Sequence, residues 1–382
     1  MTGVLRGFLG ACAVVGVLVG AAAAQPVDVS EALKPLTTKH GVPGMAALVI
    51  RGGDAVASGV AGVRAAGGEA AVEAGDLWHI GSCTKAMTAT MLATFVDEGV
   101  LAWTSTVGEK LADVPMDAGW KDVTLEQLLA HRAGVAKSLD ADGLWGRLWN
   151  HQGTEREQRQ VLVAALLAKP PLSAPGEKFL YANAGFTIAA AMAERAADKA
   201  WEDLMRERLF GPLGMKSAGF GAPGVPGEVT QPRGHDGEGK PVEPGPNHAG
   251  DNPAAIGPGG TVHLSMEDWG RFAALHLAGE RGTSTVVKPE TLRGMHRPYN
   301  APGSNYGWGW IFTERPWGAG RVFTHGGSNT LWMAVVWVAP EKNMAVLVAC
   351  NRGGDGASKA CDEAAGLLAR RFIEPESVVA KP

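Results

Sequence analysis

The sequence has little charge of either sign in any one place, few cysteines and, beyond its first 24 residues, no long hydrophobic run. Charged residues make up 19% of its 382 residues, with a net charge of −4 and a pI near 6.2. Because no block of lysine and arginine stands out, a nucleic-acid partner is not expected. A hydrophobic content of 46% instead predicts a globular chain with a sizeable core, built as one large domain or two lobes.

The first 24 residues have the pattern of a secretory signal peptide. Arg6 provides a short positive region, and the apolar run FLGACAVVGVLVGAAAA ends in small residues just before Gln25. This order predicts export to the periplasm or the extracellular space, with cleavage that leaves a mature chain of residues 25–382. A membrane anchor is the competing interpretation, but the run is short and rich in small residues. Lipidation at Cys12 is a minor alternative, because little apolar sequence precedes that residue.

The cysteines that remain after cleavage do not form a disulfide framework, because Cys83, Cys350 and Cys361 are an odd number. Cys350 and Cys361 could pair in an oxidising compartment, although their spacing alone does not decide it. Cys83 follows a serine directly and has no sign of a histidine partner, so we expect it to be a small buried residue.

Hydrophobic periodicity predicts strands near both ends of the chain. Two apolar runs, residues 45–50 and 55–62, flank a Gly-Gly turn and predict a hairpin. A Gly/Pro-dense segment, residues 221–260, predicts loop with at most short strands. Near the other end, apolar runs predict strands at residues 308–313, 321–327, 331–340 and 344–351.

Helices are predicted mainly in the middle of the chain, with one more at each end. The signals are helical spacing of apolar residues, capping side chains at the starts and glycines at the ends. The predicted helices cover residues 30–40, 82–97, 124–134, 155–168, 184–197, 200–210, 266–279 and 356–373.

This order predicts a two-lobed α+β fold. One antiparallel β-sheet is expected from the N- and C-terminal strands, flanked by the terminal helices, with an all-helical lobe inserted into it. The sheet lobe would comprise about residues 25–80 and 305–382, and the mainly helical lobe about residues 81–304. A cleft between two such lobes is the expected place for an active site.

The segment GSCTKAMTATML places Ser82 at a helix start and Lys85 one turn further on the same face. A serine there gains an oxyanion donor from its own N–H, and a desolvated lysine has a lowered pKa and can accept the serine proton. Taken alone, the pair is more often a capping serine followed by a solvated lysine than a catalytic pair.

Two further motifs favour the catalytic interpretation. Tyr181 and Asn183 stand just before an apolar helix, where a phenol can shuttle protons and an amide can hold a substrate carbonyl. His325, Gly326 and Gly327 lie on or beside a predicted strand, and paired glycines let a substrate backbone approach closely.

With these motifs in this order, and with the flanking stretches TLEQLLAHRAGV and LFGPLGMKSAGF, the chain resembles the serine β-lactamase-like hydrolases of the penicillin-recognising fold. The resemblance covers about residues 30–370. It is nearest to the group that holds class C β-lactamases, soluble D-Ala-D-Ala carboxypeptidases and family VIII esterases. In that group the second motif reads Tyr-x-Asn, as it does here.

The resemblance implies a role for each matching residue. Ser82 would be acylated, while Lys85 and Tyr181 would share the general-base and general-acid work; which of the two holds the proton stays open. Asn183 would bind the substrate amide or the Lys85 ammonium. The oxyanion hole would be formed by the backbone N–H groups of Ser82 and Ser328. No metal and no organic cofactor is implied.

The strand motif departs from that of class C β-lactamases at two positions. His325 stands where those enzymes carry a lysine that helps to hold a β-lactam carboxylate, and a neutral histidine does this less well. Gly326 replaces a common threonine, which removes a hydroxyl contact, whereas Gly327 matches the family. Substrate binding is therefore expected at His325 and Gly327, with carboxylate recognition weakened.

Several other polar and aromatic residues are expected to be structural. His131 is interpreted as a hydrogen-bonded packing residue, and the stretch YGWGW at residues 306–310 as core. His235 and His248 match no metal-site spacing and are expected in a solvated loop. Trp145 and Trp149 would either line the cleft or form a buried helix face.

The sequence thus favours an exported serine hydrolase that acts on ester or amide bonds of a small-molecule or peptide substrate. An esterase or a D-Ala-D-Ala carboxypeptidase is favoured over a true β-lactamase because of His325. The alternative from another class is a penicillin-fold protein that only binds a peptide or partner. Oligomeric state and natural substrate stay open.

Overall fold

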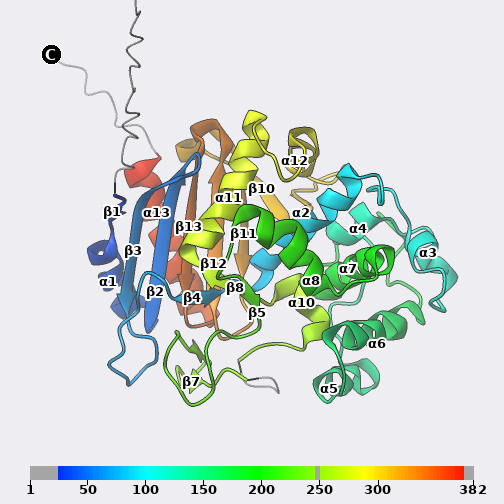
Figure 1. Cartoon of the computed structure of the whole chain (residues 1–382), viewed down its shortest axis with the longest axis horizontal. Coiled ribbons are helices and arrows are strands. Elements are labelled where there is room, and N and C mark those ends of the chain that lie inside the picture. Colours follow the sequence, from blue (N-terminus) through cyan, green and yellow to red (C-terminus); the bar gives the residue numbers. More distant parts are fainter. Residues whose placement is uncertain (1–24, 246–249, 374–382) are drawn as a thin grey trace, which may run out of the picture.

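The structure of the protein, a computed structural model, describes residues 25–245 and 250–373. The predicted signal peptide, Cys12 and His248 lie outside the described residues. The described chain has an α+β fold, with a large sheet in one half and packed helices in the other, as predicted (Figure 1). Among its helices, none is both long enough and apolar enough to cross a membrane.

The large sheet has eight strands and joins the two ends of the chain. Strand β2 (Gly44–Arg51) pairs antiparallel with β13 (Met344–Cys350), so that Val49 lies opposite Val346. β2 also forms the predicted hairpin with β3 (Asp54–Gly62). The other strands are β1 (Val27–Asp28), β9 (Tyr306–Gly307), β10 (Trp310–Arg315), β11 (Gly320–Gly327) and β12 (Met333–Ala339), in the spatial order β1-β3-β2-β13-β12-β11-β10-β9.

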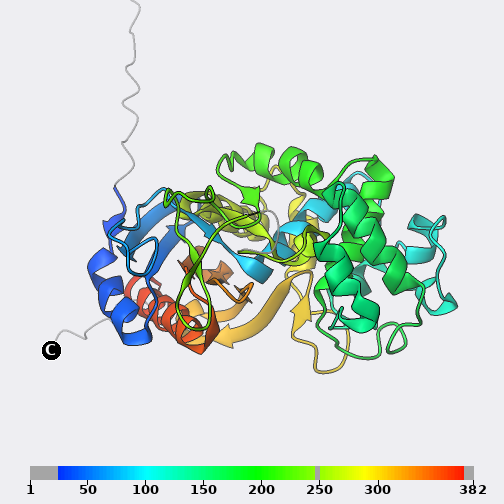
Figure 2. The same ribbon diagram turned by 90° about the horizontal axis from the view of Figure 1, so that it is seen from below.

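Helices cover both faces of this sheet. Helices α1 (Ser30–His40) and α13 (Gly354–Phe372) lie side by side on one face, and α11 (Met266–Arg281) crosses the other (Figures 1 and 2). Alternate residues of β2 therefore enter two separate cores, Val49 beneath α1 and α13 and Leu48 beneath α11. This double burial explains why the strand is apolar along almost its whole length.

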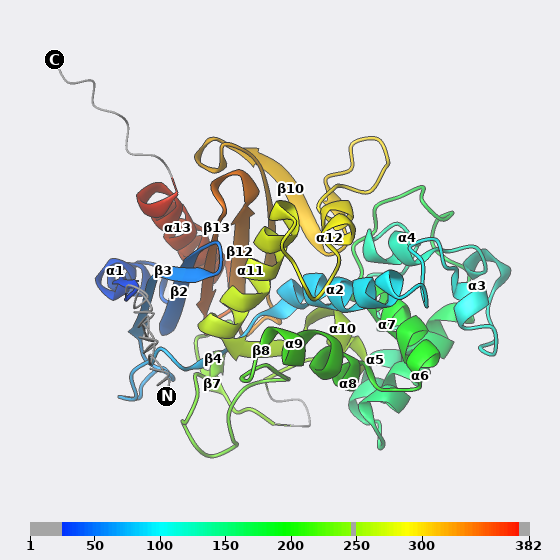
Figure 3. The same cartoon turned by 45° about the horizontal axis from the view of Figure 1, so that its top comes forward.

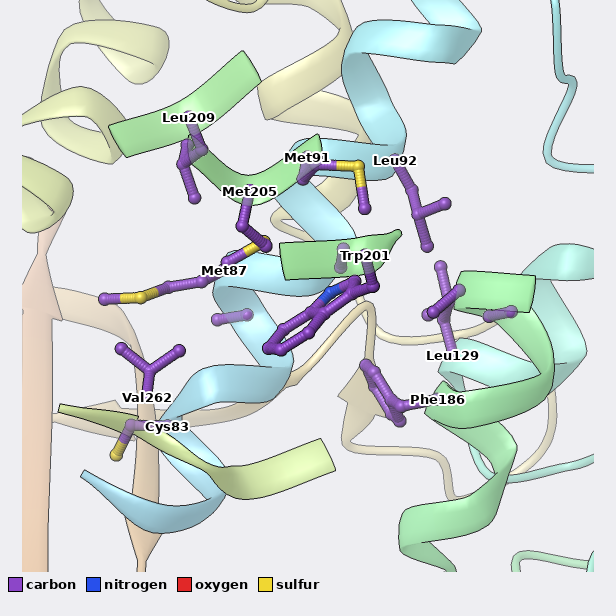
Figure 4. Close-up of a cluster of buried hydrophobic side chains, with 14 of the residues drawn as sticks. Cys83, Met87, Met91, Leu92, Leu129, Phe186, Trp201, Met205, Leu209 and Val262 are labelled. Atoms are coloured by element: carbon purple, nitrogen blue, oxygen red, sulfur yellow. The ribbon is translucent and has the colours of Figure 1, made fainter. Parts of the chain in front are cut away.

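Helix α2 (Thr84–Asp97) runs between the sheet and the helical half of the molecule (Figure 3). Of its 14 residues, 12 are buried, because sheet and helices enclose it on all sides. Figure 4 shows Met87 and Met91 of α2 around Trp201, which begins α8. The other α-helices of the described residues are α3 (Val107–Lys110), α4 (Leu125–Leu129), α5 (Leu144–Trp149), α6 (Glu155–Leu167), α7 (Asn183–Ala197), α8 (Trp201–Met205), α9 (Gly211–Leu213), α10 (Gly257–Gly260) and α12 (Pro289–Met295).

The structure corrects the sequence predictions in three places. The segment 221–260 is not loop and strand alone, because a 3₁₀ turn (Ala254–Ile256) and α10 close it, with Pro258 inside the first helical turn. Helix α4 ends at Leu129 rather than near Gly134. The structure also contains two small sheets whose strands are too short to show a periodic pattern in the sequence. One has three strands, β4 (Leu77–His79), β8 (Val262–Ser265) and β5 (Gly219–Phe220), and the other is a hairpin of β6 (Gly234–His235) and β7 (Pro241–Val242).

Candidate active site

Ser82 lies in a 3₁₀ turn, Gly81–Cys83, that leads directly into α2. Gly81 has a φ of +49°, and a Cβ at this position would come within 2.4 Å of the Ser328 nitrogen. A side chain here would therefore be strained and would also clash with the neighbouring strand segment. The glycine before Ser82 is what lets the turn reach the end of β11.

Lys85 is completely buried and directs its ammonium at Ser82. Its Nζ lies 2.9 Å from Ser82 Oγ, 2.7 Å from Asn183 Oδ1 and 2.6 Å from the carbonyl oxygen of Gly259. Burial lowers the pKa of Lys85 to about 7. The lysine can therefore exist as a neutral amine near physiological pH, which is the form that accepts a proton from a serine.

Tyr181 completes the group around Ser82 from the loop before α7. Its ring lies under the Lys85 ammonium, with Nζ 4.9 Å from the ring centroid. Burial raises the pKa of Tyr181, and a hydrogen bond with the Ser82 side chain opposes that rise in part. The phenol is thus protonated near neutral pH and able to pass a proton on. The structure brings Ser82, Lys85, Tyr181 and Asn183 together, as the motifs predict.

His131 packs directly against Tyr181, with the ring centroids 4.2 Å apart. Its Nδ1 accepts a hydrogen bond of 3.2 Å from the Ala182 N–H, in keeping with the expected packing role. Burial, together with the charge of Lys85, lowers the pKa of His131 well below its usual range. The neutral imidazole therefore supports the loop that carries Tyr181.

His325 is turned into the protein and both of its ring nitrogens have protein partners. Nε2 lies 3.0 Å from the Tyr306 hydroxyl and Nδ1 lies 2.6 Å from the Gly326 carbonyl oxygen. Burial, reinforced by the charge of Lys85, lowers the pKa of His325 to about 3, so the ring is neutral. The substrate-binding role expected for His325 stays a prediction.

Gly327, at the end of β11, makes the closest approach to the serine turn. A Cβ there would lie 2.0 Å from the Ile80 carbonyl oxygen and 2.6 Å from the Ser82 nitrogen, so only glycine fits. Gly326 is different, since the nearest atom to a Cβ would be Met333 Cε at 3.6 Å. The backbone segments of Ser82 and Ser328 therefore lie next to each other, and the oxyanion role expected of their N–H groups stays a prediction.

A cavity of about 250 Å³ opens beside Asn183. Lys137, Asp140, Trp145 and Asn252 contribute to its lining. Of the two alternatives for the tryptophans, Trp145 thus lines the space next to the site. Trp149 lines a separate cavity of about 520 Å³ and packs edge-to-face on Trp145, with centroids 6.0 Å apart.

Three further residues differ from, or add to, the sequence predictions. His235 is fully buried and not in a solvated position. Both ring nitrogens have protein partners there, since Nε2 accepts from the Ala66 N–H at 3.0 Å and Nδ1 contacts the Asn351 carbonyl oxygen. Tyr306 was expected only as core, yet it holds His325. Lys85 also contacts the backbone carbonyl of Gly259. Because this partner is a backbone group of a residue without a side chain, the sequence offered no motif for it beyond the Gly/Pro-rich surroundings.

The three cysteines of the described chain are free and buried. Cys83 donates to the His325 carbonyl oxygen at 3.3 Å, and burial raises the pKa of its thiol, as expected of a small packing residue. Cys350 and Cys361 lie with their Sγ atoms 3.7 Å apart as two thiols. Across the described ranges, no group of three or more His, Cys, Asp and Glu side chains could hold a metal ion.

Comparison with known proteins places the chain in a family. The family model described as "Beta-lactamase" matches residues 29–370. The chain belongs to the beta-lactamase family. Its relatives in this family are serine hydrolases, so the protein is an enzyme of that kind.

This beta-lactamase family member resembles proteins of more than one activity. It is 27% identical to penicillin-binding protein 4 of Amycolatopsis lactamdurans over 342 residues, which cover 85% of this chain and 84% of that protein. It is 23% identical to the D-alanyl-D-alanine-carboxypeptidase/endopeptidase AmpH of Escherichia coli K12 over 353 residues, 86% of this chain and 87% of that protein. A D-stereospecific amidohydrolase from Streptomyces sp. shares the fold, with a TM-score of 0.67 at 22% identity over 88% of this chain and 96% of that one.

Proposed function

We propose that the protein is an exported serine hydrolase that cleaves ester or amide bonds through an acyl-enzyme on Ser82. The observation that carries this proposal is the contact between a buried Lys85, with a pKa of about 7, and Ser82 Oγ at 2.9 Å. A nucleophile and a base within hydrogen-bond distance are the minimum that acyl transfer needs.

Acylation would begin with transfer of the Ser82 hydroxyl proton to neutral Lys85. Ser82 Oγ then forms a bond to the substrate carbonyl carbon, and the carbonyl oxygen becomes an oxyanion that accepts from the N–H groups of Ser82 and Ser328. When the intermediate collapses, the bond to the leaving group breaks. The proton from Lys85 passes through the Tyr181 hydroxyl to the leaving oxygen or nitrogen.

Deacylation would reverse these proton movements with water as the nucleophile. Lys85, neutral again, takes a proton from water by way of Tyr181, and the hydroxide attacks the acyl carbon. Collapse breaks the bond to Ser82 Oγ, which regains its proton. Because burial raises the pKa of Tyr181 and lowers that of Lys85, we assign the base to Lys85 and the relay to Tyr181.

Among substrates, an ester or a peptide ending in D-alanine is favoured over a β-lactam. The neutral, buried His325 offers no cation to a β-lactam carboxylate. The relatives named above include a D-alanyl-D-alanine-carboxypeptidase, which supports the peptidase side of this proposal. Export rests on the signal pattern of the first 24 residues alone.

The test is intact mass spectrometry of the mature protein incubated with benzylpenicillin, with Ser82→Ala as the control. A lasting adduct that is absent from the variant supports a Ser82 acyl-enzyme and a carboxypeptidase. An intact antibiotic without adduct, combined with Ser82-dependent ester hydrolysis, supports an esterase. Rapid loss of the antibiotic without an adduct would instead favour a β-lactamase activity. Ester turnover that survives in Ser82→Ala would contradict the proposal.

A further inference from the structure

Beside Ser82, a buried histidine connects the serine turn to a distant aspartate. His79, the last residue of β4, is fully buried, and its Nδ1 accepts a 3.2 Å hydrogen bond from the Gly81 N–H. Its Nε2 lies 2.8 Å from Asp251 Oδ2. Since Nδ1 accepts from a backbone N–H, the imidazole carries its proton on Nε2 and donates it to the carboxylate.

The same carboxylate is bound on its other side by the segment that follows Ser328. Asp251 Oδ1 accepts from Asn329 Nδ2 at 3.1 Å and from the Asn252 N–H at 2.7 Å. Asn329 is itself fixed, because Nδ2 also donates to the Gly250 carbonyl oxygen at 2.9 Å. The Asp251 side chain is 9% exposed, so these partners replace most of its water.

We propose that His79, Asp251 and Asn329 form a clamp that positions the two oxyanion donors, an inference that rests on the proposed function. The clamp ends on Gly81, next to Ser82, and on Asn329, next to Ser328. Because each attachment point is the immediate sequence neighbour of a donor residue, the clamp fixes the two donor segments relative to each other. Its three side chains are positioning residues, which act through the backbone of the serine turn and of the strand end.

The two carboxylate oxygens of Asp251 contact different partners, so replacing one oxygen with an NH₂ group tests the clamp directly. Within the described residues, Oδ1 contacts two donors, the Asn252 N–H and the Asn329 amide, whereas Oδ2 contacts His79. In an Asp251→Asn variant the amide oxygen must take the place of Oδ1, so the amide NH₂ faces His79. The imidazole must then accept at Nε2 and carry its proton on Nδ1, directly opposite the Gly81 N–H. Two donors facing each other would push the serine turn out of place.

The test uses Asp251→Asn with a matched control, Glu280→Gln. Glu280 forms a similar carboxylate–histidine contact, 2.7 Å from the buried His296, but in α11 and away from Ser82. For a p-nitrophenyl ester, we expect Asp251→Asn to lower kcat by at least about tenfold with KM little changed, because oxyanion donors act in the transition state. Inhibition by phenylboronic acid, which forms a tetrahedral adduct with serine, should weaken by a similar factor. Glu280→Gln should change neither value.

Asn329→Ala provides a second route, since it releases the clamp from the other end without changing the histidine tautomer. It should show the same loss of kcat and of boronate affinity as Asp251→Asn. If both variants keep the wild-type kcat, or lose kcat while phenylboronic acid binds as before, the clamp does not position the oxyanion donors. The proposed function is tested separately, because only an active Ser82→Ala variant would contradict it.

Discussion

The hydroxyl of Tyr306 lies 3.0 Å from Nε2 of His325, and this contact holds the imidazole inside the protein. Both residues are buried, at 2% and 3% exposure. Burial, with the charge of Lys85, lowers the pKa of His325 to about 3. His325 is therefore a neutral acceptor in this site rather than a cation, and its titration lies far below the range in which the enzyme would work.

The first prediction concerns His325→Gln. Because the imidazole is neutral from pH 5 to pH 9, replacing it with a neutral amide should leave the midpoint of the pH–rate profile where it is. The loss of one neutral hydrogen bond should cost about 0.5–1.5 kcal/mol, so kcat/KM for an ester should fall by roughly tenfold or less. Steady-state rates across that pH range measure both effects. A midpoint that moves would show that His325 titrates during catalysis.

The second prediction concerns the pH dependence that Lys85 imposes. Burial lowers the pKa of Lys85 to about 7, and only the neutral amine can take the Ser82 proton. We therefore expect kcat/KM to rise with pH through an apparent pKa near 7 and to level off above it. The Lys85→Arg variant, which stays charged, should lose about 10²–10⁴-fold in kcat/KM at pH 8. A profile that falls as pH rises from 6 to 8 would contradict this role.

The third prediction compares two neighbouring glycines of β11. A Cβ at Gly327 would lie 2.6 Å from the Ser82 nitrogen, whereas one at Gly326 would lie 3.6 Å from its nearest neighbour. Gly327→Ala should displace the serine turn and lower kcat/KM by about 10²-fold or more, the effect expected when an oxyanion donor is lost. Gly326→Ala should stay near the wild-type value. Equal activity in the two variants would show that the close approach at Gly327 is not needed.

The fourth prediction concerns stability in the helical half. Arg159 is fully buried and its guanidinium binds Glu194 at 2.6 Å and Glu202 at 2.6 Å. Arg159→Met would leave two buried carboxylates without their partner, so the free energy of unfolding should fall by about 3–5 kcal/mol. Chemical denaturation monitored by circular dichroism measures this change.

The control for that experiment is Arg195→Met, which removes an exposed partner of Asp113 on the surface of α7. Because surface ion pairs are weak, its unfolding free energy should change by about 1 kcal/mol or less. If both variants lose the same amount, the buried position of Arg159 does not account for its contribution.

Much of the fold and the centre of the site could be predicted from local sequence. The serine and lysine of the candidate site are one helical turn apart, so their proximity follows from helix geometry alone, and the structure places Nζ 2.9 Å from Oγ. The two apolar runs and the Gly-Gly turn between them likewise predict the β2–β3 hairpin from neighbouring residues. In each case the pattern and the contact lie within about 20 residues of chain.

Contacts between distant segments were decided only by the tertiary structure. His79 and Asp251 are 172 residues apart, and Lys85 and Gly259 are 174 residues apart. Neither pair has a spacing that any local pattern could reveal, and the Gly259 carbonyl is a backbone group that every residue possesses. Local sequence specifies which chemical groups the candidate site contains and the order in which the chain presents them. Packing decided how deeply they are buried, and burial is what lowers the pKa values of Lys85 and His325, because removing water penalises the charged form of each.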